Sequence, residues 1–189
     1  MDPPHADDGD VLARIASLVT ASRPSCGQVR VVAVDGPSGA GKSTLASALS
    51  TRLDAPVVHL EEIYPGWDGL DQGVALVTER VLQPLARGDD PAYRRWDWDE
   101  NRWGAAVTVP WVPLLIVEGV GSSVRPAGDL AAVRVWVDAT RDVRFERAIA
   151  RDGESYRAHW EHWAQQESTL FAADNTRARA HLVIDTTPR

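Results

Sequence analysis

The sequence is poor in residues of two kinds, with a single cysteine, Cys26, and a single lysine, Lys42, among its 189 residues. One cysteine excludes a disulfide framework and a cysteine-rich metal centre, as is typical of a protein from a reducing cytosol. No run approaches the roughly 20 apolar residues of a membrane span, and the acidic start MDPPHADDGD lacks the apolar core of a signal peptide. We therefore predict a cytoplasmic protein without a membrane partner.

Positive charge is also scarce: the sequence has 20 basic and 27 acidic residues, and its formal net charge is −7. A protein that coats nucleic acid needs basic stripes, so we predict no nucleic-acid partner. The chain length suits one main domain, predicted over residues 29–189. Before it, residues 1–28 are expected to hold a disordered lead over 1–9 and a short amphipathic helix capped by Asp10. The sequence gives no indication of the oligomeric state.

The segment GPSGAGKS, from Gly36 to Ser43, fits the phosphate-loop pattern G-x-x-x-x-G-K-[ST] at every fixed position. It lies between the apolar run 29–34 and a helix-forming run, which is the setting that the loop requires. The single lysine falls inside this loop, where a planar guanidinium cannot replace a compact ammonium. We predict that the loop binds ATP with Mg²⁺ through Gly36, Pro37, Ser38, Gly39, Ala40, Gly41, Lys42, Ser43 and Thr44. Lys42 would reach the β- and γ-phosphates, and Ser43 would bind the metal.

Five apolar runs predict buried strands, at 29–34, 55–60, 114–117, 132–137 and 182–184. With the helical patterns between them, they indicate an α/β fold, a three-layer sandwich around a five-stranded parallel sheet, with a small β-hairpin and a lid. Such sheets bind ligands outside the carboxyl ends of their strands. His59, inside the second run, is expected to be a packed core histidine, and Asp35 is expected to hydrogen-bond in the turn that opens the loop.

Carboxylates follow two of these runs. Glu61 and Glu62 come directly after the second run, and beside a phosphate loop such a group can accept the proton of an acceptor hydroxyl. The alternative is a pair of solvated surface carboxylates. Glu118 ends the run 114–117, where a phosphate-loop protein needs a carboxylate near its metal, so the predicted metal ligands are Ser43 and Glu118. The alternative for Glu118 is a capping or turn residue.

A tryptophan-rich stretch over residues 91–112 has alternating character that predicts a β-hairpin with its turn at 99–104. Four of the eight tryptophans fall in it. A stacking ring, a cation and an acceptor could hold a planar base and a sugar hydroxyl, and the alternative is a small apolar subcore. The residues predicted to bind substrate here are Tyr93, Arg95, Trp96 and Asp97.

Arginines spaced about one turn apart mark the helix that begins at Arg141, and DGES interrupts the helix after Arg151. We predict a lid over 151–158 that places guanidinium groups on the transferring phosphate, with Arg147 and Arg151 catalytic and Arg157 in contact with substrate. Solvated arginines are the alternative.

Taken in order, these features resemble the uridine kinase-like branch of the phosphate-loop kinases over residues 29–187. The family's D-x-F-Y segment corresponds to Glu61 through Tyr64, which implies that Glu61 is the catalytic base, Glu62 its fallback, and Tyr64 a substrate contact. Its E-G pair corresponds to Glu118-Gly119, and its R…R-D series to Arg147 and Arg151-Asp152. The resemblance implies transfer of the γ-phosphoryl group of Mg-ATP to a small acceptor, most often a nucleoside.

Two alternatives stay open at this point. The loop DGPSGAGKS also resembles that of cytidylate kinases, so the acceptor could be a nucleoside monophosphate or another small metabolite. The protein could also bind ATP without transferring phosphate.

Overall fold

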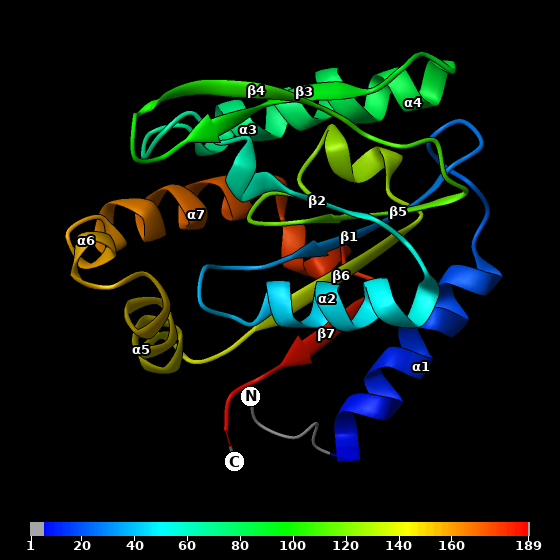
Figure 1. Ribbon diagram of the computed structural model, residues 1–189. Helices are drawn as coiled ribbons and strands as arrows, with labels where there is room; N and C mark the ends of the chain where they lie inside the picture. Colours follow the sequence, from blue (N-terminus) through cyan, green and yellow to red (C-terminus); the bar gives the residue numbers. More distant parts are fainter. Residues whose placement is uncertain (1–5, 189) are drawn as a thin grey trace.

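The computed structural model describes residues 6–188, and its centre is a parallel sheet with the strand order β2-β5-β1-β6-β7 (Figure 1). The five strands are β1 (Arg30–Asp35), β2 (Val57–His59), β5 (Leu114–Glu118), β6 (Val133–Asp138) and β7 (Leu182–Asp185). The predicted α/β fold with five parallel strands is confirmed. β1 is the central strand, a position that its run of residues apolar on both faces predicts.

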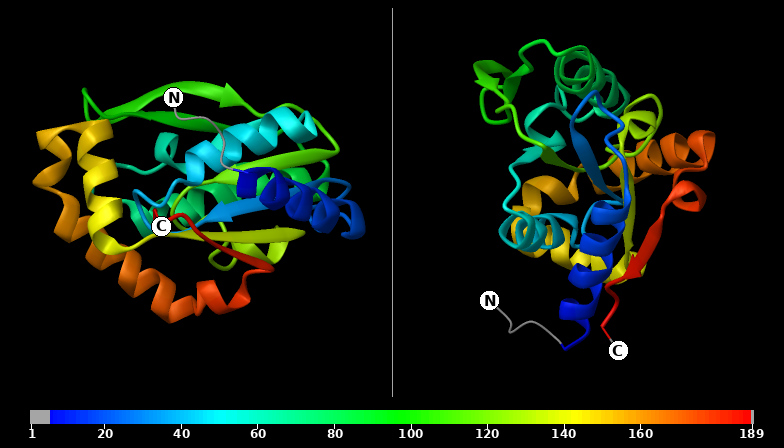
Figure 2. Two further views of the ribbon diagram at one scale, coloured as in Figure 1. Left: turned by 90° about the horizontal axis from the view of Figure 1, so that it is seen from below. Right: turned by 90° about the vertical axis from the view of Figure 1, so that its right-hand side faces the viewer.

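Helices cover both faces of this sheet. Successive residues of β1 enter different cores, since Val32 and Val34 pack with α1 (Ala6–Ala21) and α2 (Lys42–Leu53). Val31 and Ala33 pack instead with the helical segment 70–87 and with Trp163 of α7 (Trp160–Asp174). Because successive side chains of a strand point to opposite faces of the sheet, helices can pack on both faces, and the molecule has three layers. Figure 2 shows the arrangement from two further sides.

The N-terminal helix is longer than predicted. It begins at Ala6 and buries Ile15 and Val19 against the sheet, so residues 6–9 are helical and Asp10 is not its cap. The first five residues of the predicted lead lie outside the described part of the chain. The proposed division into residues 1–28 and 29–189 stays a prediction. Among residues 6–188, no helix is both long enough and apolar enough to cross a bilayer.

The segment between β2 and β5 packs on the face of the sheet opposite α1 and α2, at the top in Figure 1. The helical segment after β2 runs through α3 (Leu70–Val77), a widened turn at Thr78–Leu82 and α4 (Gln83–Arg87). The widened turn precedes Pro84 and takes up the backbone distortion that a proline imposes. The predicted hairpin follows as β3 (Ala92–Asp97) and β4 (Arg102–Thr108), a separate antiparallel pair.

The predicted lid lies at the end of the sheet towards which β1 points, on the left in Figure 1. These residues, 151–158, contain the end of α5 (Arg141–Asp152), a break at Gly153 and α6 (Glu154–Arg157), and α7 follows them. Gly153 has φ +77°, a backbone conformation that favours glycine. The sequence DGES thus separates two helices, as predicted.

Candidate functional site

The phosphate loop connects β1 to α2 and leaves several backbone amides free. Gly36 has φ +135°, and a Cβ there would lie 1.9 Å from the carbonyl oxygen of Val137, so glycine is required. The amides of Gly39, Gly41, Lys42 and Ser43 make no hydrogen bond to other described residues. Free amides at the start of a helix form an anion site, which fits the phosphates of a nucleotide.

Lys42 is buried beneath this loop, with 7% of its surface exposed, and its Nζ donates to the carbonyl oxygen of Pro37 at 3.0 Å. Burial lowers the pKa of Lys42, and the carboxylates of Glu118 and Glu167 oppose that change. An incoming phosphate would add negative charge and stabilise the ammonium further.

Asp35 ties the beginning of the loop to the segment after β5. Its carboxylate is fully buried and accepts hydrogen bonds from the amides of Gly36, Gly121 and Ser123 and from the hydroxyl of Ser123, at 2.7 to 2.8 Å. Burial raises the pKa of Asp35, and these hydrogen bonds oppose the rise. The prediction that Asp35 hydrogen-bonds in the turn is confirmed.

Ser43 and Glu118 lie together, as a shared metal site requires. The hydroxyl of Ser43 donates to Glu118 Oε1 at 3.2 Å, and Glu118 Oε2 lies 2.7 Å from His59 Nδ1. Burial alone would raise the pKa of Glu118, but the His59 hydrogen bond and the charge of Lys42 outweigh it and lower the pKa. An ionised carboxylate beside a hydroxyl is an oxygen-ligand set that fits Mg²⁺.

His59 is not the core histidine that we predicted. Its side chain is 42% exposed, and its ring contacts Glu118. The reason is register, because β2 is an edge strand beside β5 and pairs His59 directly with Glu118. The Glu118 hydrogen bond raises the pKa of His59.

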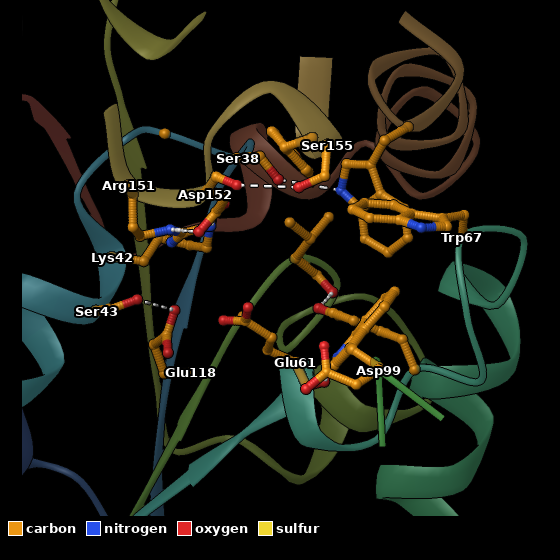
Figure 3. A pocket seen from close by; sticks show the side chains of 17 residues that line it. Ser38, Lys42, Ser43, Glu61, Trp67, Asp99, Glu118, Arg151, Asp152 and Ser155 are labelled. Carbon is orange, nitrogen blue, oxygen red and sulfur yellow. Dashed lines mark hydrogen bonds and ion pairs between the residues drawn. The ribbon is translucent and has the colours of Figure 1, made fainter. Parts of the chain in front are cut away.

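A cavity of about 380 Å³ opens at the carboxyl ends of β1, β2 and β5 (Figure 3). It joins the phosphate loop to the segment after β2, to the hairpin and to the helices α5, α6 and α7. Its lining contains Ser38, Gly39, Lys42, Ser43, Glu61, Tyr64, Trp67, Trp98, Asp99, Glu118, Gly119, Val120, Arg151, Asp152, Ser155, Tyr156 and Trp163. The cavity thus has a phosphate-binding part and an aromatic part.

The two candidate bases differ sharply in their surroundings. Glu61 lines the cavity, and its carboxylate has no hydrogen bond or ion pair with any described residue. Glu62 is bound to the hairpin, since its carboxylate accepts from the hydroxyl of Tyr93 at 2.5 Å and lies 2.8 Å from Arg95 Nη2. Of the two candidate bases, only Glu61 therefore presents to the cavity a carboxylate without a partner among the described residues.

Comparisons with known proteins point to nucleotide kinases. The family model described as cytidylate kinase matches residues 32–97. The cytidylate kinase of Corynebacterium glutamicum is 42% identical over 71 residues, or 33% of this chain and 30% of that protein. The cytidylate kinase of Pseudomonas aeruginosa is 30% identical over 130 residues, or 67% of this chain and 57% of that protein. The chain therefore spans about a third to just over half of the length of these curated relatives.

One solved structure, described as a possible uridine kinase from Bacillus stearothermophilus, matches with a TM-score of 0.69 at 18% identity, over 95% of this chain and 100% of that one. The chain belongs to the P-loop nucleotide kinase superfamily. Within that superfamily, the sequence matches point to cytidylate kinases, whereas we predicted the uridine kinase-like branch from the motifs. The family match ends at Asp97, before Glu118 and the predicted lid.

The hairpin of this P-loop protein reaches the cavity through Trp98 and Asp99 rather than through the four residues predicted to bind substrate. Tyr93 and Arg95 bind Glu62, and Trp96 packs edge-on against Trp103 with ring centroids 5.0 Å apart. Trp98 Nε1 donates to the carbonyl oxygen of Glu61 at 2.9 Å. The hairpin therefore holds the Glu61-Glu62 turn in place from two sides.

The three arginines predicted to act with the lid lie in different surroundings. Arg151 lines the cavity and forms two hydrogen bonds with the carboxylate of Asp152, at 2.7 and 2.6 Å. Arg147 instead binds Thr186 through the hydroxyl and the carbonyl oxygen, both at 2.8 Å. Arg157 pairs with Glu154 outside the lining. Of the three predicted arginines, the structure brings only Arg151 to the cavity.

Several residues of the aromatic part were missed by sequence reasoning. Trp67 stacks on His159 with centroids 4.2 Å apart and lies 4.9 Å from Trp98 and 5.3 Å from Tyr156. Tyr64 was predicted and lines the cavity, with its hydroxyl donating to the carbonyl oxygen of Val120 at 2.8 Å. Tyr156 lies within the predicted lid at 151–158, so its position after the DGES break was the signal available for it.

Proposed function

We propose that the chain is an ATP-dependent small-molecule kinase of the nucleoside and nucleotide kinase group. One observation carries this proposal: the phosphate-loop Lys42, the Ser43–Glu118 pair and the unpartnered carboxylate of Glu61 all line one cavity, with Arg151 on the lid side (Figure 3). Phosphoryl transfer requires mainly positioning and charge stabilisation, and these residue types supply both.

Each part of the cavity then has a role. The free amides of the loop bind phosphate oxygens, and Lys42 stabilises charge on the transferring group. Ser43 and Glu118 would hold Mg²⁺, with His59 orienting the Glu118 carboxylate. Bound Mg-ATP supplies the γ-phosphoryl group. Glu61 accepts the proton of an acceptor hydroxyl, and Arg151 closes over the site from α5.

The sequence comparisons favour CMP as the acceptor, because both the family model and the curated relatives are cytidylate kinases. From the motifs alone, we predicted a nucleoside as the acceptor and gave a nucleoside monophosphate as the alternative. CMP is therefore the first acceptor to test. A nucleotide acceptor of this size would be a small-molecule partner, and we propose no nucleic-acid or membrane partner.

A nucleoside is the second candidate, and the charges of the cavity favour it. The lining holds two cations, Lys42 and Arg151, and Arg151 is already bound by Asp152. A monophosphate acceptor needs a further cation for its own phosphate. Glu61 and Asp99 put negative charge on the acceptor side instead. A base such as Glu61 serves a hydroxyl acceptor, whereas a phosphate oxygen attacks without losing a proton.

The test is release of ADP from Mg-ATP with CMP, dCMP, UMP, cytidine and uridine, each against a blank without acceptor. We expect ADP release that depends on one class of acceptor. A signal with CMP alone supports the cytidylate kinase reading, and a signal with cytidine or uridine supports the nucleoside reading. Hydrolysis that no acceptor stimulates, or no hydrolysis, would contradict the proposed kinase activity for these acceptors.

Trp98 and Trp96 offer a matched pair for testing the acceptor side. We expect Trp98→Ala to raise the KM for the acceptor about tenfold, because a ring that stacks on a base contributes about 1–3 kcal/mol. Trp96→Ala should leave that KM near the wild-type value and lower the free energy of unfolding by about 1–3 kcal/mol. Steady-state kinetics and urea unfolding measure the two effects. A rise in acceptor KM for Trp96→Ala alone would reverse the assignment.

A further inference from the structure

Ser38, at the tip of the phosphate loop, is bound through all of its polar groups to helices of the lid side. Its backbone N–H donates to Glu167 Oε1 at 2.8 Å, and its hydroxyl accepts from Trp163 Nε1 at 3.0 Å. Its carbonyl oxygen accepts from Arg144 Nη1 at 3.3 Å. Glu167 and Trp163 belong to α7 and Arg144 to α5, so the tip of the loop is held from outside the sheet.

Glu167 is the unusual member of this group. Its surface is 3% exposed, and its Oε2 lies 3.9 Å from Arg144 Nη1. A buried carboxylate destabilises a protein unless it is paired and hydrogen-bonded. Glu167 has both kinds of partner, yet it lies outside the lining of the cavity and takes no part in the proposed chemistry. Its contacts point to a role in the shape of the loop.

The loop and the lid helices are also in close backbone contact. A Cβ on Gly39 would lie 2.1 Å from the carbonyl oxygen of Arg144, so the chain of α5 touches the loop next to Ser38. The amide of Ser38 faces Glu167, whereas the neighbouring amides of Gly39 and Gly41 remain free. The loop is therefore anchored at Ser38, whereas the amides from Gly39 onward are available to bind phosphate.

We propose that Glu167 is a positioning residue for the phosphate loop. Its carboxylate turns the Ser38 amide towards α7 and, with Arg144, fixes the loop tip before nucleotide binds. A loop that is already ordered loses less conformational entropy on binding, and the nucleotide therefore binds more tightly. The inference rests on the proposed function, since it requires that the loop binds a nucleotide.

The same helix reaches the other side of the cavity. Gln166 Nε2 donates to the carbonyl oxygen of Trp67 at 2.7 Å, and the ring of Trp163 packs edge-on against Tyr64 at 5.1 Å. Residues 163, 166 and 167 of α7 thus contact both the phosphate loop and the segment that follows Glu61. The position of the loop tip is fixed relative to the acceptor side of the cavity through these contacts.

The experiment is calorimetric titration of Mg-ADP into the full chain and its variants. Glu167→Ala removes a hydrogen bond to a charged group, so we expect the Kd for Mg-ADP to rise about tenfold. Glu167→Gln keeps an oxygen that can accept from Ser38 and should recover part of that loss. The matched control is Glu161→Gln, an exposed carboxylate on the same helix that pairs with Arg141, and its Kd should equal the wild-type value.

Two further readouts separate positioning from simple loss of stability. In kinetics, the KM for ATP should rise for Glu167→Ala while kcat changes less, because the interaction acts on nucleotide binding throughout the reaction. Urea unfolding shows whether each variant is folded during the titration. If Glu167→Ala does not fold, Glu167→Gln and Trp163→Phe take its place, and both should raise the Kd.

Each outcome decides between the proposals. Folded Glu167 and Trp163 variants that bind Mg-ADP within twofold of wild type would overturn the positioning role and leave the nucleotide site intact. Wild-type protein that fails to bind Mg-ADP would overturn the proposed function, and the positioning role with it. A rise in Kd for Glu161→Gln equal to that of Glu167→Ala would also overturn the inference, because the effect would not depend on the contact with Ser38.

Discussion

Replacing Lys42 with methionine should lower kcat for phosphoryl transfer by about 10² to 10³-fold, as expected when a positioned charge is removed from a transition state. Lys42 is the cation beneath the free amides of the loop. Its side chain is buried, and the hydrogen bond from Nζ to the carbonyl oxygen of Pro37 fixes the position of the charge. The fold should remain, because the methionine side chain matches the length of the buried stem. ADP release measures the activity, and thermal unfolding measures the fold.

The arginine variant makes this test more specific. Lys42→Arg keeps the charge, but its planar guanidinium does not fit a pocket shaped for an ammonium, so we expect it to lose most of the activity as well. Arg52→Met, an exposed position on the same helix, is the control and should retain full activity. Near-normal turnover in Lys42→Met would contradict the proposed role of the loop.

Features that are encoded within one stretch of sequence could be predicted. The run 29–34 is apolar on both faces, which predicts a strand in the middle of a parallel sheet, and β1 does pair with β5 on one side and β6 on the other. The loop motif includes the glycines that its backbone requires, and Glu118 ends the strand beside it. These signals are local. Parallel strands have their carboxyl ends at the same edge of the sheet, and this brings Ser43 and Glu118 together.

Contacts between distant segments could not be predicted in this way. His59 lies in an apolar run, and only the pairing of β2 with β5 shows that it meets Glu118. Within the hairpin, an irregularity between Arg94 and Trp96 breaks the alternation of faces, so the pattern did not show that Trp98 enters the cavity. Glu167 has no motif of its own, because its partner Ser38 lies 129 residues away.

Replacing Glu61 with glutamine should lower kcat by about 10² to 10⁴-fold with a hydroxyl acceptor, while the affinity for Mg-ATP stays close to wild type. The amide has the size of the carboxylate but cannot accept a proton. The Glu61 carboxylate lies in the cavity without a partner among residues 6–188, so its replacement breaks no side-chain contact that holds the fold. Single-turnover transfer and nucleotide titration separate the chemical step from binding.

Glu62→Gln is the matched variant, one residue away. Its carboxylate holds Tyr93 and Arg95, so its loss should loosen the hairpin and lower activity less than Glu61→Gln does. A larger loss in Glu62→Gln would assign the base to Glu62. The size of the Glu61 effect also bears on the acceptor, because a phosphate oxygen needs no base. A loss below about tenfold with CMP as acceptor would therefore favour the cytidylate kinase reading, with Glu61 as a binding group for the acceptor.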